Sequence, residues 1–159
     1  MEQNGVCLTT GLKNSMILFI IFISHWYLSL FVQTFFLHRY ASHQMFKMHP
    51  ITEKIFFILT WIAQGSSFLH PAAYALMHRK HHEYSDTDKD PHSPVSFNSW
   101  FKFMYKTRDE YASFIDRVNQ GKYTDKTLPR WPLIEKIGDS YISRIGFALF
   151  YVLLYIMFA

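Results

Sequence analysis

Histidines gathered in two short blocks are the residues of this chain best suited to chemistry. The first block runs from His38 to His43 and reads H-R-Y-A-S-H. The second runs from His78 to His92 and reads H-R-K-H-H-E-Y-S-D-T-D-K-D-P-H. Neutral imidazole is the commonest metal ligand among protein side chains. The two blocks therefore predict a metal site. Its candidate ligands are His38, His43, His78, His81 and His82.

Spacing within the blocks indicates how the ligands could converge. In the second block, histidines three and four residues apart lie on one face of an α-helix and can reach one metal ion. His38 and His43 are five residues apart, which is about 140° around a straight α-helix. We expect that pair to ligate different metals, or the helix to break between them. Asp86, Asp90 and His92 follow the second block's ligands. Carboxylates there can orient imidazoles by accepting their N–H bonds, with a solvated acidic turn as the alternative.

The kinds of ligand present narrow the choice of metal. Cys7 is the only cysteine, which excludes an internal disulfide and an all-thiolate site. A zinc peptidase would carry H-E-x-x-H, but the run that begins H-E at His82 has Asp86 in the last position. Sites rich in imidazole and free of cysteine suit iron, zinc or copper. We rank iron first among these.

Composition places the site in a membrane protein. The chain has 159 residues, which predicts one domain, and it is 50% hydrophobic and 19% aromatic. The net charge is only +4, and the basic residues are scattered between Arg79 and Arg144, so nucleic acid is not an expected partner. We predict an all-α integral membrane protein whose histidine blocks lie in a cytosolic helical cap, with membrane lipid as a partner.

Two apolar runs are the candidates for membrane helices. Residues 1–15 are polar and small and are expected to form a flexible lead. The run 16–37 carries no formal charge and would make a helix of about 33 Å, enough to cross the hydrocarbon. The uncharged run 145–159 reaches only about 22 Å, which is too short to cross. We therefore expect an incomplete transmembrane helix over 142–159 and a chain that is one part of a longer protein.

The segments between these runs decide the topology. If residues 51–76 crossed the membrane once, the two blocks would lie on opposite faces and could not share a metal centre. We therefore expect 38–92 to carry both blocks with an interfacial or re-entrant helix between them. Lys and Arg crowd the region 93–141, which predicts a cytoplasmic, amphipathic segment. The pattern over 99–118 suits the lipid headgroup layer, with an ordinary surface helix of the cap as the alternative.

The two blocks resemble a known family. The pattern H-R-x-x-x-H followed by H-R-x-H-H-x-x-S-D-T-x-x-D-P-H is similar to the first two histidine boxes of membrane fatty acid desaturases. It looks most like the acyl-CoA (delta-9 type) branch and its bacterial members, and the resemblance covers roughly residues 16–159. It implies an oxidoreductase with two non-haem iron ions. With O2 as co-substrate, such an enzyme introduces a cis double bond into a fatty acyl chain and forms two waters.

The same resemblance implies the ligands, partners and location. The five block histidines named above would be iron ligands, and electrons would come from an external carrier such as cytochrome b5 or ferredoxin. The acyl group would ride on CoA, acyl carrier protein or a lipid. The histidine boxes would face the cytoplasm, at the plasma membrane if the protein is bacterial.

The chain also departs from the family pattern. The family carries a third box, H-x-x-H-H, and a further ligand histidine before it, whereas this chain has nine histidines and none after His92. Five box ligands are too few for two irons. We therefore expect a partial desaturase domain over 16–159 that is inactive alone. A related di-iron lipid hydroxylase or ketolase and a non-catalytic membrane remnant are the alternatives, and the S-D-T-x-x-D-P-H tail favours the desaturase.

Overall fold

The computed structural model describes residues 2–85, 87–94, 97–123 and 125–158, and this part of the chain is helical without strands. The all-α prediction is confirmed. The elements in chain order are α1 (Glu2–Val32), the π-helix η1 (Gln33–Ser42), α2 (Pro50–Gln64), the 3-10 turn η2 (Gly65–Ser67), α3 (Pro71–Tyr84), α4 (Trp100–Asn119), α5 (Pro132–Asp139) and α6 (Tyr141–Phe158).

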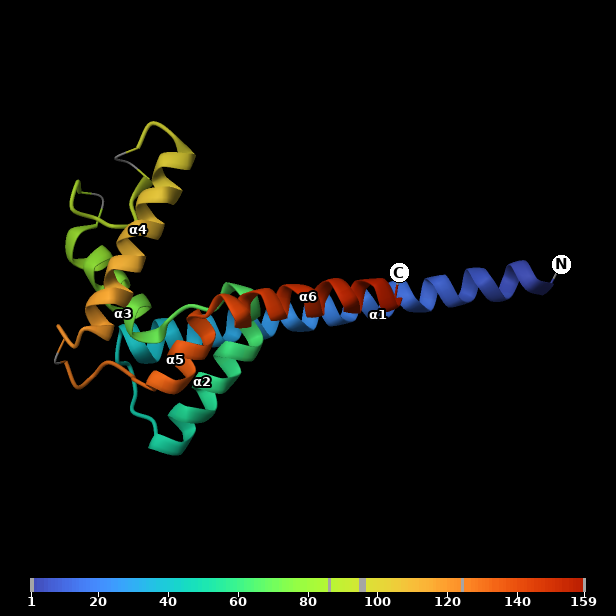
Figure 1. The fold of residues 1–159 in the computed structure, drawn as a ribbon, viewed down its shortest axis with the longest axis horizontal. Helices are drawn as coiled ribbons and strands as arrows, with labels where there is room; N and C mark the ends of the chain where they lie inside the picture. Colours follow the sequence, from blue (N-terminus) through green and yellow to red (C-terminus); the bar gives the residue numbers. More distant parts are fainter. Residues whose placement is uncertain (1, 86, 95–96, 124, 159) are drawn as a thin grey trace.

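Helices α1 and α6 lie side by side along the long axis of the molecule (Figure 1). The continuous helix Lys13–Ser42 and α6 are both long and apolar enough to cross a membrane, by length and composition. Large apolar side chains cover their outer surfaces and are exposed. The two helices are joined by a hydrogen bond of 3.0 Å between the Tyr151 hydroxyl and His25 Nε2. This pair gives both polar groups a partner inside an otherwise apolar contact.

Helical backbone reaches both ends of the described chain. Helix α1 begins at Glu2, within the segment 1–15 where we expected a flexible lead. That segment contains no proline, so nothing in it forbids helical backbone. We expected an incomplete span over 142–159, but α6 has 18 residues and meets the length and composition of a span. The helix gains length by including Arg144, whose guanidinium donates to the carbonyls of Ser66 and Phe68 and to the Asp139 carboxylate.

Between the two long helices the chain makes an excursion and returns. Helix α2 leads to η2, which packs against α6, and the chain then runs back to α3 beside η1 (Figure 1). Gly65 makes this turn possible, because its φ is +53° and a Cβ there would overlap the Tyr151 hydroxyl. The excursion brings both histidine blocks to the same end of α1. Its depth in a membrane stays a prediction.

Small residues set the spacing beneath the histidines. Ala41 of η1 and Ala72 and Ala75 of α3 are fully buried in one cluster with Val118 and Leu128. Alanines at a helix contact let the two backbones approach closely. A second cluster, built from Phe36, Leu37, Phe57 and Ile134, joins η1 to α2 and α5. The site therefore rests on a packed base to which five helices contribute: η1, α2, α3, α4 and α5.

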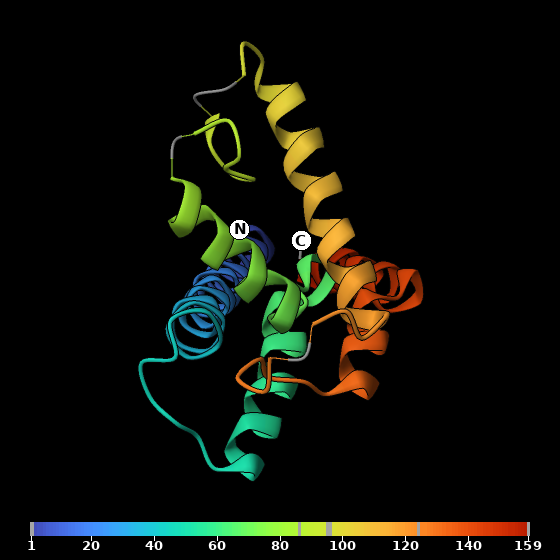
Figure 2. The same ribbon diagram turned by 90° about the vertical axis from the view of Figure 1, so that its left-hand side faces the viewer.

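Helix α4 crosses the direction of α1 in both views (Figures 1 and 2). It packs on α3 and buries Phe114 and Val118. Lys80 of α3 and Glu110 of α4 form an ion pair of 2.6 Å along this contact. Helix α4 thus supports α3, the carrier of the second histidine block.

Candidate metal centre

The first block lies in a π-helix, which the sequence did not predict. In η1 the backbone bonds run from residue i to i+5, and the same pattern closes its end: the His43 N–H donates to the His38 carbonyl at 3.0 Å. Residues five apart therefore share a face, and the Nε2 atoms of His38 and His43 are 3.2 Å apart. The 140° separation expected for an α-helix does not occur. Instead, the α-helix α1 gives way to the π-helix η1 at Gln33, before His38. Such π segments are rare and are frequent at functional sites.

The second block lies on α3, whose start is fixed by two local features. Pro71 occupies the first turn, and the His70 side chain accepts a hydrogen bond from the Ala73 N–H at 3.4 Å. These are ordinary helix-start signals. Two turns later His78 and His82 project from one face, with their Nε2 atoms 3.1 Å apart.

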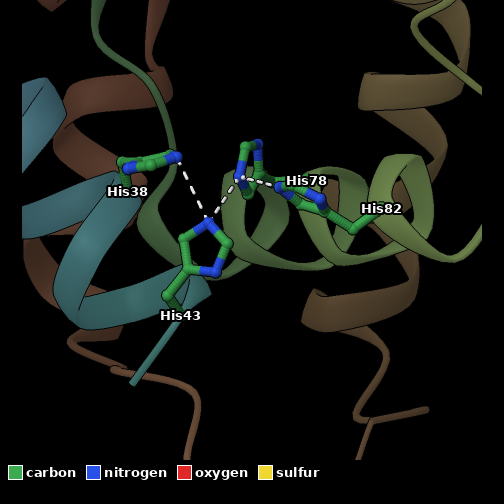
Figure 3. A group of neighbouring side chains, drawn as sticks. All are labelled: His38, His43, His78 and His82. Carbon is green, nitrogen blue, oxygen red and sulfur yellow. Dashed lines mark hydrogen bonds between the residues drawn. The ribbon is translucent and has the colours of Figure 1, made fainter. Parts of the chain in front are cut away.

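The two blocks meet in a group of four histidines (Figure 3). His43 bridges them, because its Nε2 atom is also 3.1 Å from Nε2 of His78. The ligand atoms of His38, His43, His78 and His82 all lie within 4.8 Å of one another. For metal–nitrogen bonds of about 2.1 Å, neighbouring nitrogens are about 3.0 Å apart in octahedral and about 3.4 Å apart in tetrahedral geometry. Three of the separations in the group, 3.1, 3.1 and 3.2 Å, fall in that interval. The group therefore fits one metal ion.

The surroundings keep the half-buried His78 neutral. Burial, followed by the neighbouring His38 and His82 rings, lowers the pKa of His78 to about 4. A metal ligand must offer a deprotonated nitrogen, so this imidazole is ready to bind at neutral pH. The Tyr74 ring stacks on His78 with centroids 5.8 Å apart and planes 6° apart, which fixes the orientation of the imidazole.

His81 stands outside this group. Its Nδ1 atom lies 2.9 Å from both oxygens of Asp90, a buried carboxylate that also accepts the His92 N–H at 2.8 Å. An ionised carboxylate only accepts, so Nδ1 of His81 donates and Nε2 is the nitrogen that carries the free lone pair. The ring centroids of His81 and His92 are 6.2 Å apart. Asp86 lies outside the described residues. The structure thus gathers four of the five predicted ligands and holds the fifth beside them.

Arg79 is a site residue that the sequence analysis missed. Its Nε and Nη2 atoms donate to the carbonyls of Ser42 and Ala41 at 2.9 and 2.8 Å, and Nη1 donates to Asp125 at 2.8 Å. Carbonyls at the end of a helix lack donors within the helix, so Arg79 satisfies those of η1. Hydrogen bonds from Thr127, together with the Arg79 guanidinium, lower the pKa of Asp125. Arg79 thereby ties α3 to η1 next to His43 and His78.

A cavity of about 420 Å³ adjoins the histidines. His78, His81 and His92 line it together with apolar side chains, among them Leu69, Met77 and Met104. A larger groove of about 820 Å³ lies between α2, α5 and α6 and is lined by no histidine. The smaller cavity is the one that can bring an apolar ligand to the candidate metal centre.

The fold and the site together define a class: a helical, membrane-associated protein with clustered histidines that suit a metal ion. The sequence matches the Fatty acid desaturase family over residues 14–159, and the chain belongs to this family.

Three relatives illustrate the range of the family. The chain is 36% identical to Delta-9 desaturase-like 3 protein of Arabidopsis thaliana over 45% of this chain and 23% of that one. It is 41% identical to Hex-5-enoyl-[acyl-carrier protein] acetylenase of Moorena producens over 45% of this chain and 22% of that one. It is 26% identical to Delta-9 acyl-lipid desaturase 2 of Arabidopsis thaliana over 72% and 36%. The chain thus spans only about a quarter to a third of these relatives. No solved structure gives a significant match.

Proposed function

We propose that this chain supplies part of the catalytic centre of an acyl-CoA-type desaturase that inserts a cis double bond into a fatty acyl chain with O2. The observation that carries this proposal is the convergence of four imidazoles from two separate blocks beside an apolar cavity. Membership in the desaturase family supports the reaction class.

The four-histidine group would hold one iron ion, because neutral imidazole nitrogens at these separations suit that metal. Bound iron supplies the oxidising power that removes hydrogen from an unactivated methylene. His81, oriented by Asp90, would serve a second ion of a di-iron centre. The chain's own residues hold the ligands in place: Tyr74 stacks on His78, and Arg79 fixes the end of η1.

The cavity beside His78 would take the acyl chain. Its walls carry Leu69, Met77 and Met104, and each methylene that such walls remove from water contributes roughly 0.8 kcal/mol to binding. The acyl group would arrive on CoA, with acyl carrier protein or a lipid as the other carriers to test. Electrons would come from cytochrome b5 or ferredoxin at the cytoplasmic face.

We also propose that the 159-residue chain alone does not desaturate. One four-histidine group with His81 beside it provides too few ligands for two irons. The test is to express the chain in membranes and supply acyl-CoA, O2 and a reduced donor. The products are then analysed by gas chromatography and mass spectrometry. We expect bound iron without unsaturated product. An alkene would refute the inactivity, and an alcohol or ketone would favour the hydroxylase or ketolase alternative.

The acyl site can be tested without turnover. A photoreactive acyl-CoA should label peptides that line the cavity, and Met77→Trp should abolish that labelling by filling the space. Met45→Trp is the matched control, because Met45 is 66% exposed and lies outside the cavity lining. Iron content reports whether each variant keeps its fold. Equal labelling of the two variants would contradict the proposed acyl site.

A further inference from the structure

The first half of α4 presents large apolar side chains that the described chain does not cover. Trp100, Phe101, Met104 and Tyr105 are 65%, 68%, 45% and 64% exposed. Residues spaced in this way lie on one face of a helix. The contact of α4 with α3 uses another side of the helix, through the Glu110–Lys80 pair and the buried Phe114. A soluble helix would expose its charges on such a free face, so this face calls for an apolar partner.

The direction of this face identifies the partner. Further along α4, the same face carries Arg108, Tyr111 and Ile115, which line a hollow shared with Tyr141 and Arg144 at the start of α6. Helix α6 is a candidate membrane span, so the apolar face turns toward the side on which a bilayer would lie. Helix α4 also crosses the direction of α1 and α6 in both views (Figures 1 and 2), as a helix lying along a membrane surface does.

Two further features mark the level of the membrane surface. Tyr141 and Ile142 begin α6 and are 81% and 87% exposed, and aromatic residues at a span's end are typical of the headgroup level. The Arg108 side chain is 73% exposed and lies 3.9 Å from the Asp109 carboxylate. Lys102 and Lys106 are exposed on the other side of α4. Such basic residues favour anionic lipids.

We propose that the first half of α4 lies in the headgroup layer of an anionic bilayer. Trp100, Phe101 and Tyr105 insert into the boundary of the acyl region, and Arg108 contacts lipid phosphate. Since α4 packs on α3, this anchor holds the second histidine block at the membrane surface. The inference rests on α4 and α6 and is independent of the metal and of the reaction.

Spin labels on the full chain test this placement. In a Cys7→Ser background, labels are attached at Phe101→Cys and Tyr105→Cys, and the matched controls are Lys102→Cys and Lys106→Cys on the other side of α4. The protein is reconstituted in phosphatidylcholine–phosphatidylglycerol vesicles. Power-saturation EPR then compares collision with O2, which concentrates in lipid, and with a water-soluble nickel chelate.

We expect the ratio of O2 to nickel collisions to exceed one at positions 101 and 105 and to fall below one at 102 and 106. Ratios below one at all four positions would make α4 a surface helix of a cytosolic cap and overturn the proposal. Protection of 101 and 105 from both reagents would indicate a protein partner and would overturn it as well. All four side chains are exposed, so the labels leave the core unchanged, and a label at Trp100→Cys provides a further test of the apolar face.

Discussion

Replacing Glu135 by Gln probes the network that holds the start of α3. Glu135 is 2% exposed and accepts hydrogen bonds from Arg130 Nε at 3.2 and 3.1 Å and from the Trp131 N–H at 2.9 Å. One of its oxygens also lies 3.5 Å from Nε2 of the fully buried His70, which caps α3. Glutamine keeps the volume and one oxygen for the Trp131 N–H but removes the charge.

The size of the expected loss of stability depends on how deeply the partners of Glu135 are buried. Breaking a fully buried ion pair costs about 3–5 kcal/mol, whereas losing a hydrogen bond to a charged group costs about 1.5–3 kcal/mol. The Arg130 side chain is 33% exposed, so its guanidinium can regain water when the carboxylate is gone. The second case therefore applies, and we expect Glu135→Gln to lower the free energy of unfolding by about 2 kcal/mol at neutral pH.

The loss should depend on pH in a defined direction. Burial alone would raise the pKa of Glu135, but His70, the Trp131 N–H and Arg130 together lower it. A carboxyl group whose pKa is lower in the folded state stabilises the fold above its unfolded pKa, here near 4.5. That contribution disappears as the pH falls through the folded value. The gap between wild type and Glu135→Gln should therefore be widest at neutral pH and close on acidification.

The assay is denaturant unfolding of the full chain in mild detergent, followed by circular dichroism over a series of pH values. Asp109→Asn is the control, because Asp109 is 73% exposed in a surface pair and such pairs contribute about 0–1 kcal/mol. The reasoning is refuted if Glu135→Gln unfolds like the control at neutral pH. A gap that does not change with pH would refute the role of the charge.

Further predictions concern the clamp on η1 and the packing of α5. Arg79→Ala should weaken metal binding by about 10–100-fold, because it frees the carbonyls at the end of η1; a competitive metal titration that shows unchanged affinity would exclude this role. Gly138→Ala should cost about 1–3 kcal/mol, since a Cβ there would lie 2.5 Å from the buried Phe68 ring. Gly146→Ala, with no atom within 4 Å of its Cβ, should not destabilise, and equal losses in thermal unfolding would contradict the packing argument.

The sequence was sufficient to identify the histidines that gather in the structure, because imidazole clusters are recognised by residue type alone. It predicted the helical fold, the long apolar first helix and the histidines that meet. The requirement that both blocks share one metal excluded a single crossing by 51–76, and the structure brings the blocks to one end of α1.

What the sequence could not supply depends on backbone geometry and distant partners. Nothing in residues 33–42 distinguishes a π-helix from an α-helix, so the angular argument separated His38 from His43. The carbonyls bound by Arg79 are backbone groups that every sequence contains. The orientation of His81 depends on Asp90, nine residues later across a turn. Likewise, α6 is longer than the uncharged run because it includes Arg144. A charged residue suggests the end of a membrane helix when its hydrogen-bond partners are unknown.

Metal content tests the central claim most directly. The chain is purified in detergent, loaded anaerobically with Fe(II) and freed of excess metal. Its iron content is then measured by inductively coupled plasma mass spectrometry. We expect tightly bound iron in the wild type and none in His43→Ala, which removes the bridging imidazole. His81 lies outside the four-histidine group, so in His81→Ala this group should retain iron as in the wild type. Absence of tight iron from the wild type, or equal retention by His43→Ala and His81→Ala, would contradict a metal centre built on these four histidines.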